Sequence, residues 1–175
     1  MSDPSTPSLP QVRLRAMEPE DLDLIYVIEN DEDQWSAGRT NVPYSRYVLH
    51  DYIASATNDI YADGQVRMVI EATDGSVVGL VDLVNFSAQH LRAEISIVVL
   101  RECRRQGYAA AALRKVAAYA LRTLHLHQLY AVVAEDNEAS LALLTSCGYR
   151  EKGELDEWLY DGRGYRKAKV LQLFL

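Results

Sequence analysis

The 175-residue sequence contains only two cysteines, Cys103 and Cys147, which are too few for a disulfide framework or a four-cysteine zinc site. No run approaches the ~20 apolar residues that a membrane-spanning helix needs. The first ten residues, MSDPSTPSLP, lack the positive and apolar regions of a secretory signal. We therefore expect a cytoplasmic protein with no membrane partner, whose proline- and serine-rich residues 1–10 form a disordered tail.

Positive charge is also scarce, because 18 lysines and arginines face 25 aspartates and glutamates, giving a net charge of −7. Such a chain disfavours nucleic acid as a partner and attracts cationic substrates. A basic cluster, Arg101, Arg104 and Arg105, runs against this background and points to an anionic ligand. His125 and His127 supply two possible metal ligands with no third spaced to join them, so we predict no metal site.

One change of periodicity marks the centre of the chain. Residues 94, 96 and 98 alternate with the β-branched residues 95, 97 and 99, which predicts a strand buried on at least one face. From Ala109 onward the apolar residues follow the 3.6-residue period of an amphipathic helix. The connection from Arg101 to Tyr108 therefore joins a buried strand to a long helix.

This connection places Arg104, Arg105 and Gln106 directly ahead of Gly107. The first turn of a helix has N–H groups without intrahelical partners, and a glycine lets an anion approach the main chain. Arginines add charge-assisted hydrogen bonds. The alternative is a surface turn with solvated arginines and a helix-starting glycine. The position between a buried strand and a long helix favours a phosphate site.

Three residues of this connection carry a family resemblance. Arg104, Gly107 and Ala109 match Q/R-x-x-G-x-G/A, and the stretch resembles motif A of the GCN5-related N-acetyltransferases (GNAT). A Walker P-loop would have Lys-Ser/Thr after a second glycine, and a dinucleotide fingerprint would have another glycine two residues before Gly107. Neither is present, so the resemblance favours the pyrophosphate of coenzyme A over ATP or NAD.

A second stretch resembles motif B of the same family, with matches at Asn137, Leu141, Leu143, Gly148 and Tyr149. The family often has a tyrosine seven residues after the asparagine, which protonates the leaving thiolate, and this chain has Leu144 there. The general acid is therefore unassigned. The run from Gly153 to Ala168 resembles the polyamine and ribosomal-protein branches, so the similarity extends from about Val12 to the C-terminus.

The remaining patterns predict one domain over residues 11–175. Alternation and turn signals predict further strands at Val12–Ala16, Gln65–Glu71, Ser76–Asn85, Leu129–Ala134, Gly153–Tyr160 and Tyr165–Phe174. Helical spacing and capping residues predict helices from Pro19 to about Asn30, from Tyr47 to Ala56 and from Glu138 to Ser146. The resemblance implies an α/β (α+β) GNAT-like fold, a mixed, mostly antiparallel sheet of about seven strands flanked by four helices.

Acetyl transfer to an amine requires removal of a proton from an ammonium group whose unperturbed pKa is near 10. Glu94 is the candidate base, because a carboxylate on an otherwise apolar central strand is costly unless it lines a cleft. The alternative is that Glu94 pairs structurally with Arg92 or Arg15. For the cofactor, the resemblance implies contacts from Ile97, Val98, Val99, Arg104, Arg105, Gln106, Gly107, Tyr108, Ala109 and Asn137.

An acidic segment after the first predicted helix has two interpretations. Its carboxylates and aromatic residue are Glu29, Asp31, Glu32, Asp33 and Trp35. Charge runs usually face solvent without further function. The second interpretation is a rim that collects a cationic acceptor.

The resulting expectation is an N-acetyltransferase that takes acetyl-CoA as co-substrate. Its acceptor amine belongs to a polyamine-like small molecule or a protein N-terminus, and the chain could form a homo-oligomer. The alternative function is a noncatalytic acyl-CoA-binding or sensing module, which Leu144 permits.

Overall fold

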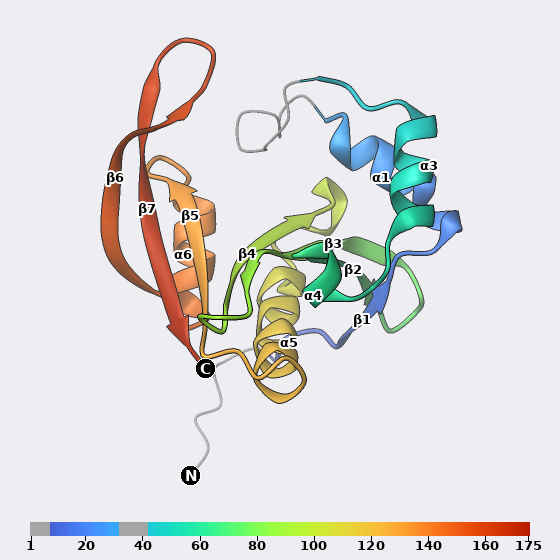
Figure 1. The fold of residues 1–175 in the computed structure, drawn as a ribbon, viewed down its shortest axis with the longest axis horizontal. Coiled ribbons are helices and arrows are strands. Elements are labelled where there is room, and N and C mark those ends of the chain that lie inside the picture. Colours follow the sequence, from blue (N-terminus) through green and yellow to red (C-terminus); the bar gives the residue numbers. More distant parts are fainter. Residues whose placement is uncertain (1–7, 32–41) are drawn as a thin grey trace.

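A seven-stranded sheet forms the centre of the molecule in the computed structural model, which describes residues 8–31 and 42–175. The strand order is β1-β2-β3-β4-β5-β7-β6, and all neighbours are antiparallel except β4 and β5. Figure 1 shows β6 and β7 extending well beyond the rest of the sheet. The fold class predicted from the sequence is confirmed. The strands are β1 (Val12–Ala16), β2 (Val66–Ala72), β3 (Val77–Ser87), β4 (Arg92–Val99), β5 (Gln128–Ala134), β6 (Arg150–Tyr160) and β7 (Tyr165–Phe174).

Helices cover both faces of this sheet. One apolar cluster joins the sheet to α1 (Leu22–Glu29) and α3 (Arg46–Ser55), and a larger cluster joins the opposite face to α5 (Tyr108–Arg122) and α6 (Glu138–Ser146). A one-turn helix, α4 (Ile60–Asp63), makes five α-helices among the described residues, one more than the four expected. Short 3-10 turns precede α1 (Pro19–Asp21) and α5 (Arg101–Cys103). In the part of the chain that the structure describes, no helix is long and apolar enough to cross a bilayer.

The start of α1 is tied to the sheet through the buried carboxylate of Asp21. Asp21 accepts hydrogen bonds from the Arg15 guanidinium at 2.7 and 2.9 Å and from the Glu18 amide at 2.8 Å. Arg15 also donates to Glu71 at 2.7 Å. Because Arg15 lies between these two carboxylates, the suggested Arg15–Glu94 pair is wrong.

This network should make stability depend on pH. The hydrogen bonds from Arg15 hold the pKa of Asp21 below its ordinary value of 3.8. The stabilisation is therefore complete above that value and is lost as the pH falls through the lower folded-state pKa. Asp21→Asn should lower the free energy of unfolding by about 1–3 kcal/mol at pH 7, and by less at pH 3, which lies below the ordinary pKa.

Urea unfolding at both pH values checks this prediction. Asp23→Asn is the matched control, because Asp23 pairs with Arg46 while its side chain is 81% exposed. Such surface pairs contribute about 0–1 kcal/mol. Equal losses for the two variants would contradict a special role for Asp21.

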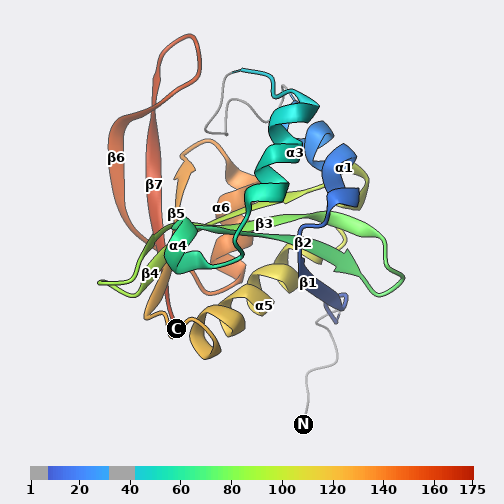
Figure 2. The same cartoon turned by 45° about the vertical axis from the view of Figure 1, so that its right-hand side comes forward.

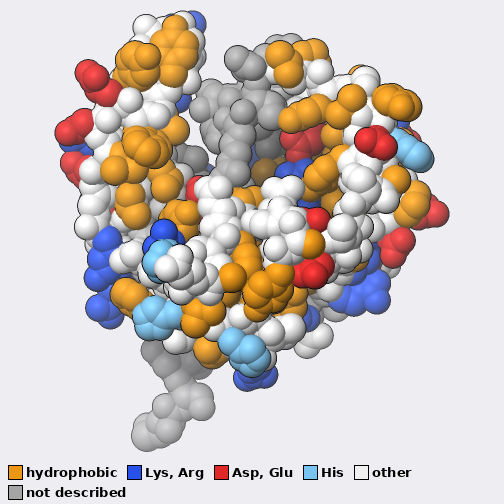
Figure 3. Space-filling view, viewed as in Figure 1, with side chains coloured by type: hydrophobic (Ala, Val, Ile, Leu, Met, Phe, Trp, Pro, Cys, Tyr) orange, Lys and Arg blue, Asp and Glu red, His pale blue; other side chains and the backbone are white. Residues whose placement is uncertain are grey.

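The tip of the β6–β7 hairpin is exposed. Tyr160 and Tyr165 are 62% and 67% exposed, and their rings contact each other at a tilt with centroids 5.3 Å apart. Figure 3 shows hydrophobic side chains gathered at the tip of this hairpin. Along the hairpin, lysines of β7 pair with carboxylates of β6, as in Lys169–Glu151 and Lys167–Glu154. Beyond the part of β7 that pairs with β5, from Ala168 to Phe174, the hairpin therefore depends on its own cross-strand contacts.

Candidate active site

The two central parallel strands separate part of the way along their length. β4 and β5 pair at Arg92–Gln128, at Ala93–Leu129 and finally at Glu94–Tyr130. Beyond that rung the described residues of the two strands form no further pairs, and Figures 1 and 2 show the ribbons diverging. Ligands of open sheets often bind beyond the carboxyl ends of parallel strands, so this split is the natural place for a substrate.

Each strand of the split leads into the N-terminus of a helix. α5 begins after Gly107, whose φ of +86° places it in the left-handed region. α6 begins at Asn137, whose side chain accepts a hydrogen bond from the Ser140 amide at 3.1 Å. Both helix starts lie on the face of the sheet that α5 and α6 cover, and both favour negative charge.

The basic loop before α5 is partly held by its own side chains. Arg104 Nε donates to the carbonyl of Val99 at 3.0 Å, and Gln106 Nε2 donates to the carbonyl of Glu102 at 2.8 Å. Arg105 has a φ of +62° and an exposed side chain. The loop thus presents the guanidinium of Arg105 and the first amides of α5, which suit a pyrophosphate.

The position that a Cβ of residue 107 would occupy is already filled by neighbouring side chains. A Cβ there would lie 2.9 Å from Pro10 Cδ and 3.3 Å from Leu9 Cδ2. The expectation that the missing Cβ makes room for an anion is therefore wrong for this direction. The glycine permits close packing of residues 9 and 10, which belong to the stretch predicted as a tail.

Glu94 lies at the last rung before the split. Its side chain shares a face of β4 with Ser96 and Val98, and Val98 packs against the cluster under α1 and α3. Asn85 Nδ2 donates to Glu94 Oε2 at 2.6 Å, from a backbone φ of +49° beside a bulge in β3. Glu94 therefore faces the side opposite to the two helix N-termini.

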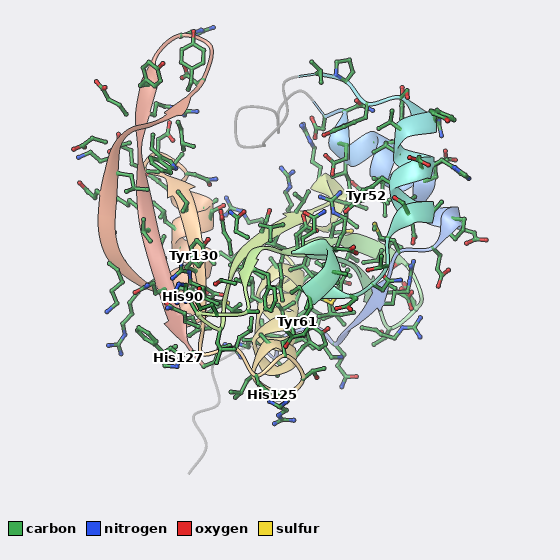
Figure 4. All side chains as sticks on the ribbon, in the orientation of Figure 1. Tyr52, Tyr61, His90, His125, His127 and Tyr130 are labelled. Atoms are coloured by element: carbon green, nitrogen blue, oxygen red, sulfur yellow. The ribbon has the colours of Figure 1, made fainter. Side chains whose placement is uncertain are left out.

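Tyr130 is the cross-strand neighbour of Glu94. Figure 4 places it on β5, close to the point where β4 and β5 part. Neither Tyr130 nor Asn85 belongs to a recognisable sequence motif, and both were missed in the sequence analysis. Only the pairing register and the β3 bulge bring them to Glu94.

The first residue of the acidic segment, Glu29, fits neither interpretation of that segment. Glu29 forms an ion pair with Arg67, and Arg67 also donates to both Asp82 oxygens at 2.8 and 2.9 Å. Burial lowers the pKa of Arg67, but the hydrogen bonds to Asp82 and the negative charges of Asp82 and Glu29 together outweigh burial and raise the pKa. Burial also raises the pKa of Tyr52, whose ring lies near the Arg67 guanidinium. Glu29 is thus part of the fold. Asp31 is described; Glu32, Asp33 and Trp35 lie outside the described residues.

Burial distinguishes the residues that bear on the identity of the general acid, which are Leu144, Tyr149 and Tyr108. Leu144 is 5% exposed and packs in the larger core cluster. Tyr149 is 1% exposed, its hydroxyl has no hydrogen-bond partner among the described residues, and burial raises its pKa. A phenol sealed in this way is a poor proton donor to a substrate. Tyr108, the first residue of α5, is half-buried beside the basic loop.

Three of the four histidines lie away from the split. Figure 4 places His90, His125 and His127 near the opposite ends of β4 and β5. The ring of His127 contacts that of Phe174 at a tilt, with centroids 5.4 Å apart. Within residues 8–31 and 42–175, no three His, Cys, Asp or Glu side chains are grouped to hold a metal ion.

A sheet that splits between two helix N-termini, with a carboxylate on the opposite face, is the arrangement of an acyl-CoA-dependent acetyltransferase. Residues 11–150 match the family model of the acetyltransferase (GNAT) domain. The chain is 30% identical to spermidine N(1)-acetyltransferase of Escherichia coli K12 over 172 residues, covering 96% of this chain and 88% of that protein. It is 28% identical to the putative ribosomal N-acetyltransferase YdaF of Bacillus subtilis, covering 85% and 83%.

A solved structure has the same fold as this chain over almost its whole length. Spermidine N-acetyltransferase from Vibrio cholerae, in complex with CoA and spermine, has a TM-score of 0.83 and 28% identity, over 94% of this chain and 95% of that chain. The same enzyme in an intermediate state is dodecameric, with a TM-score of 0.79, 27% identity and 94% of each chain covered. The chain belongs to the GNAT acetyltransferase family. It is an N-acetyltransferase that uses acetyl-CoA.

Proposed function

We propose that this enzyme acetylates a primary amine of a polyamine-like cation, using the split between β4 and β5 as its active site. The observation that carries the proposal is the position of Glu94 at the last β4–β5 rung, opposite the two helix N-termini. This arrangement allows a thioester to enter from the α5–α6 face and an amine from the α1–α3 face. We further propose that residues 11–175 act as one domain in the cytoplasm.

On the cofactor side, acetyl-CoA supplies an activated acetyl thioester. Main-chain groups of Ile97 and Val98, on the strand that borders the split, would hold its pantetheine arm, whereas the Val99 carbonyl already accepts from Arg104. The pyrophosphate would lie against Arg104, Arg105, Gln106, Gly107, Tyr108 and Ala109. Asn137 would contribute its Nδ2 donor, because its oxygen caps α6.

On the acceptor side, Glu94 would take a proton from the ammonium group, directly or through water. The hydrogen bond from Asn85 holds one oxygen of the Glu94 carboxylate, and this contact orients the whole carboxylate group. Tyr130, beside Glu94, offers an aromatic face and a hydroxyl to a cation. The net charge of −7 supports a cationic acceptor over an anionic one.

An acceptor screen at saturating acetyl-CoA tests this proposal. Thiol release should be fastest with spermidine or spermine and slower with peptide N-termini and aminoglycosides. Faster turnover of peptides would instead assign a protein N-terminus. Binding of CoA without thiol release for any amine would contradict the proposal and indicate a noncatalytic sensing module.

The acidic segment provides a second arm of the same experiment. Asp31→Asn, Glu32→Gln and Asp33→Asn together should raise the acceptor KM, and the increase should shrink as salt screens the charges. Neutralising exposed Glu20, Asp23 and Asp51 changes the net charge equally and is the control. Equal responses of the two triple variants would restore the solvated-loop interpretation.

Leu144→Tyr should raise kcat if the larger side chain turns out of the core cluster that holds Leu144 and reaches the split. The thiol of coenzyme A is an acceptable leaving group with a pKa near 8.5, so the wild type should turn over slowly and its pH–rate profile should rise with amine deprotonation without a clear falling limb. A phenol at residue 144 would add a general acid, worth about 10²- to 10⁴-fold when well placed.

Steady-state kinetics from pH 6 to 10 check this prediction, with Leu144→Phe as the control for the added ring. Fast wild-type turnover with a falling limb would show that another residue, such as Tyr108, already serves as the acid.

The enzyme could also assemble through its uncovered hairpin. We propose a homo-oligomer, supported by the dodecameric Vibrio cholerae relative and by the exposed aromatic residues Trp158, Tyr160 and Tyr165. Light scattering of the wild type tests this.

A further inference from the structure

The segment preceding β1 packs directly on the loop that the proposed function assigns to phosphate binding. Pro10 Cδ lies 2.9 Å, and Leu9 Cδ2 3.3 Å, from where a Cβ of Gly107 would be. Real Cβ atoms do not tolerate the first distance, so this contact exists because residue 107 is glycine. Leu9 and Pro10 therefore occupy the side-chain position of the loop's own glycine.

Two contacts fix this segment to the rest of the molecule. Val12, two residues later, begins β1 and pairs with Ala72 of β2. The ammonium group of Lys115, in α5, donates a hydrogen bond to the Val12 carbonyl. Figures 1 and 2 both show β1 beside α5. The segment is thus held at its β1 end and can press on the start of α5.

The loop needs such support because its backbone is unusual. Arg105 and Gly107 have φ values of +62° and +86°, so two of three consecutive residues are left-handed. A left-handed non-glycine residue costs about 1–3 kcal/mol and persists only when its surroundings impose it. Side-chain hydrogen bonds of Arg104 and Gln106 restrain the loop toward β4 and the 3-10 turn. Leu9 and Pro10 restrain it from the other side.

We propose that Leu9 and Pro10 are positioning residues for the cofactor: they hold the Arg104–Tyr108 loop in the conformation that receives the CoA pyrophosphate. The match to the GNAT family model begins at residue 11, so this contact lies outside the matched region. The proposal rests on the proposed cofactor site and not on the identity of the acceptor. Preorganising a loop raises affinity because less ordering remains to be done on binding.

A double-mutant cycle tests the contact. Its corners are the wild type, Leu9→Ala with Pro10→Ala, Gly107→Ala, and all three together. Calorimetry with CoA alone measures each Kd, so the result does not depend on turnover. The Leu9→Ala, Pro10→Ala protein should bind CoA about five- to tenfold more weakly, with the acetyl-CoA KM raised and kcat at saturation little changed.

The sign of the coupling is the decisive result. Gly107→Ala alone suffers both the left-handed φ and the clash with Pro10, whereas in the alanine background only the φ penalty remains. The triple variant should therefore bind CoA more tightly than the product of the two separate losses predicts. Gln11→Ala, at an exposed neighbour, should bind like the wild type.

Melting temperatures without and with CoA separate positioning from simple folding support. A positioning role predicts a smaller CoA-induced rise in melting temperature for the Leu9→Ala, Pro10→Ala protein. An unchanged Kd for this protein, strictly multiplicative losses in the cycle, or an unchanged CoA-induced rise would each overturn the proposal.

Discussion

Glu94→Gln should reduce kcat/KM at pH 7 by about 10²-fold or more, because general bases contribute about 10²- to 10⁴-fold. Glutamine keeps the shape of the side chain and an oxygen for Asn85, so the fold and CoA binding should survive. The loss should shrink above pH 9, where a growing fraction of the acceptor amine is already neutral and needs no base. Pre-steady-state and steady-state rates over this pH range measure the effect.

The matched control for this experiment is Glu71→Gln. Glu71 is also a strand carboxylate, but it pairs with Arg13 and Arg15 far from the split, so its substitution should affect stability and not rate. Asn85→Ala, which removes the orienting donor, should give a smaller loss than Glu94→Gln. Wild-type rates for the Glu94→Gln enzyme at pH 7 would show that Glu94 is not the general base and has a structural role only.

Gly79→Ala should destabilise the protein by about 1–3 kcal/mol or more and weaken CoA binding as well. A Cβ at residue 79 would lie 2.1 Å from the carbonyl oxygen of Val98 and 3.0 Å from Val99 Cα. Both contacts are to backbone, so β3 and β4 would have to move apart where β4 approaches the cofactor loop. Urea unfolding and CoA calorimetry measure the two effects.

Gly153→Ala provides the comparison, because this β6 glycine has no atom within 4 Å of its Cβ position. That variant should stay within about 0.5 kcal/mol of the wild type, as uncrowded surface substitutions usually do. If the two alanine variants unfolded at the same urea concentration, the close approach of β3 to Val98 would carry no energetic weight.

Local signals account for the parts of the structure that the sequence predicted well. The predicted helix from Glu138 to Ser146 and the predicted strand from Tyr165 to Phe174 have the observed bounds. Asn137 caps that helix, and Gly148 follows it with a φ of +93°. Periodicity and capping act within a few residues, so a single sequence contains the information.

Contacts between distant segments were beyond such reasoning. Glu29 looked like one charge among several, but its partner Arg67 lies 38 residues away. The position of Asn85 beside Glu94 depends on a bulge in β3, and that of Pro10 beside Gly107 on how β1 packs against α5. The family resemblance located the cofactor loop but not these supporting residues, because no short motif records them.

The strand order also determines when the sheet can be completed during synthesis. β6 precedes β7 in the chain, but β7 lies between β5 and β6. A chain that ended at Tyr160 would therefore expose the open edge of β5, and its β6 would have no strand to join. Domains fold as units during translation, and unpaired edges promote aggregation. A chain truncated after Tyr160 should therefore aggregate more readily than the full-length chain.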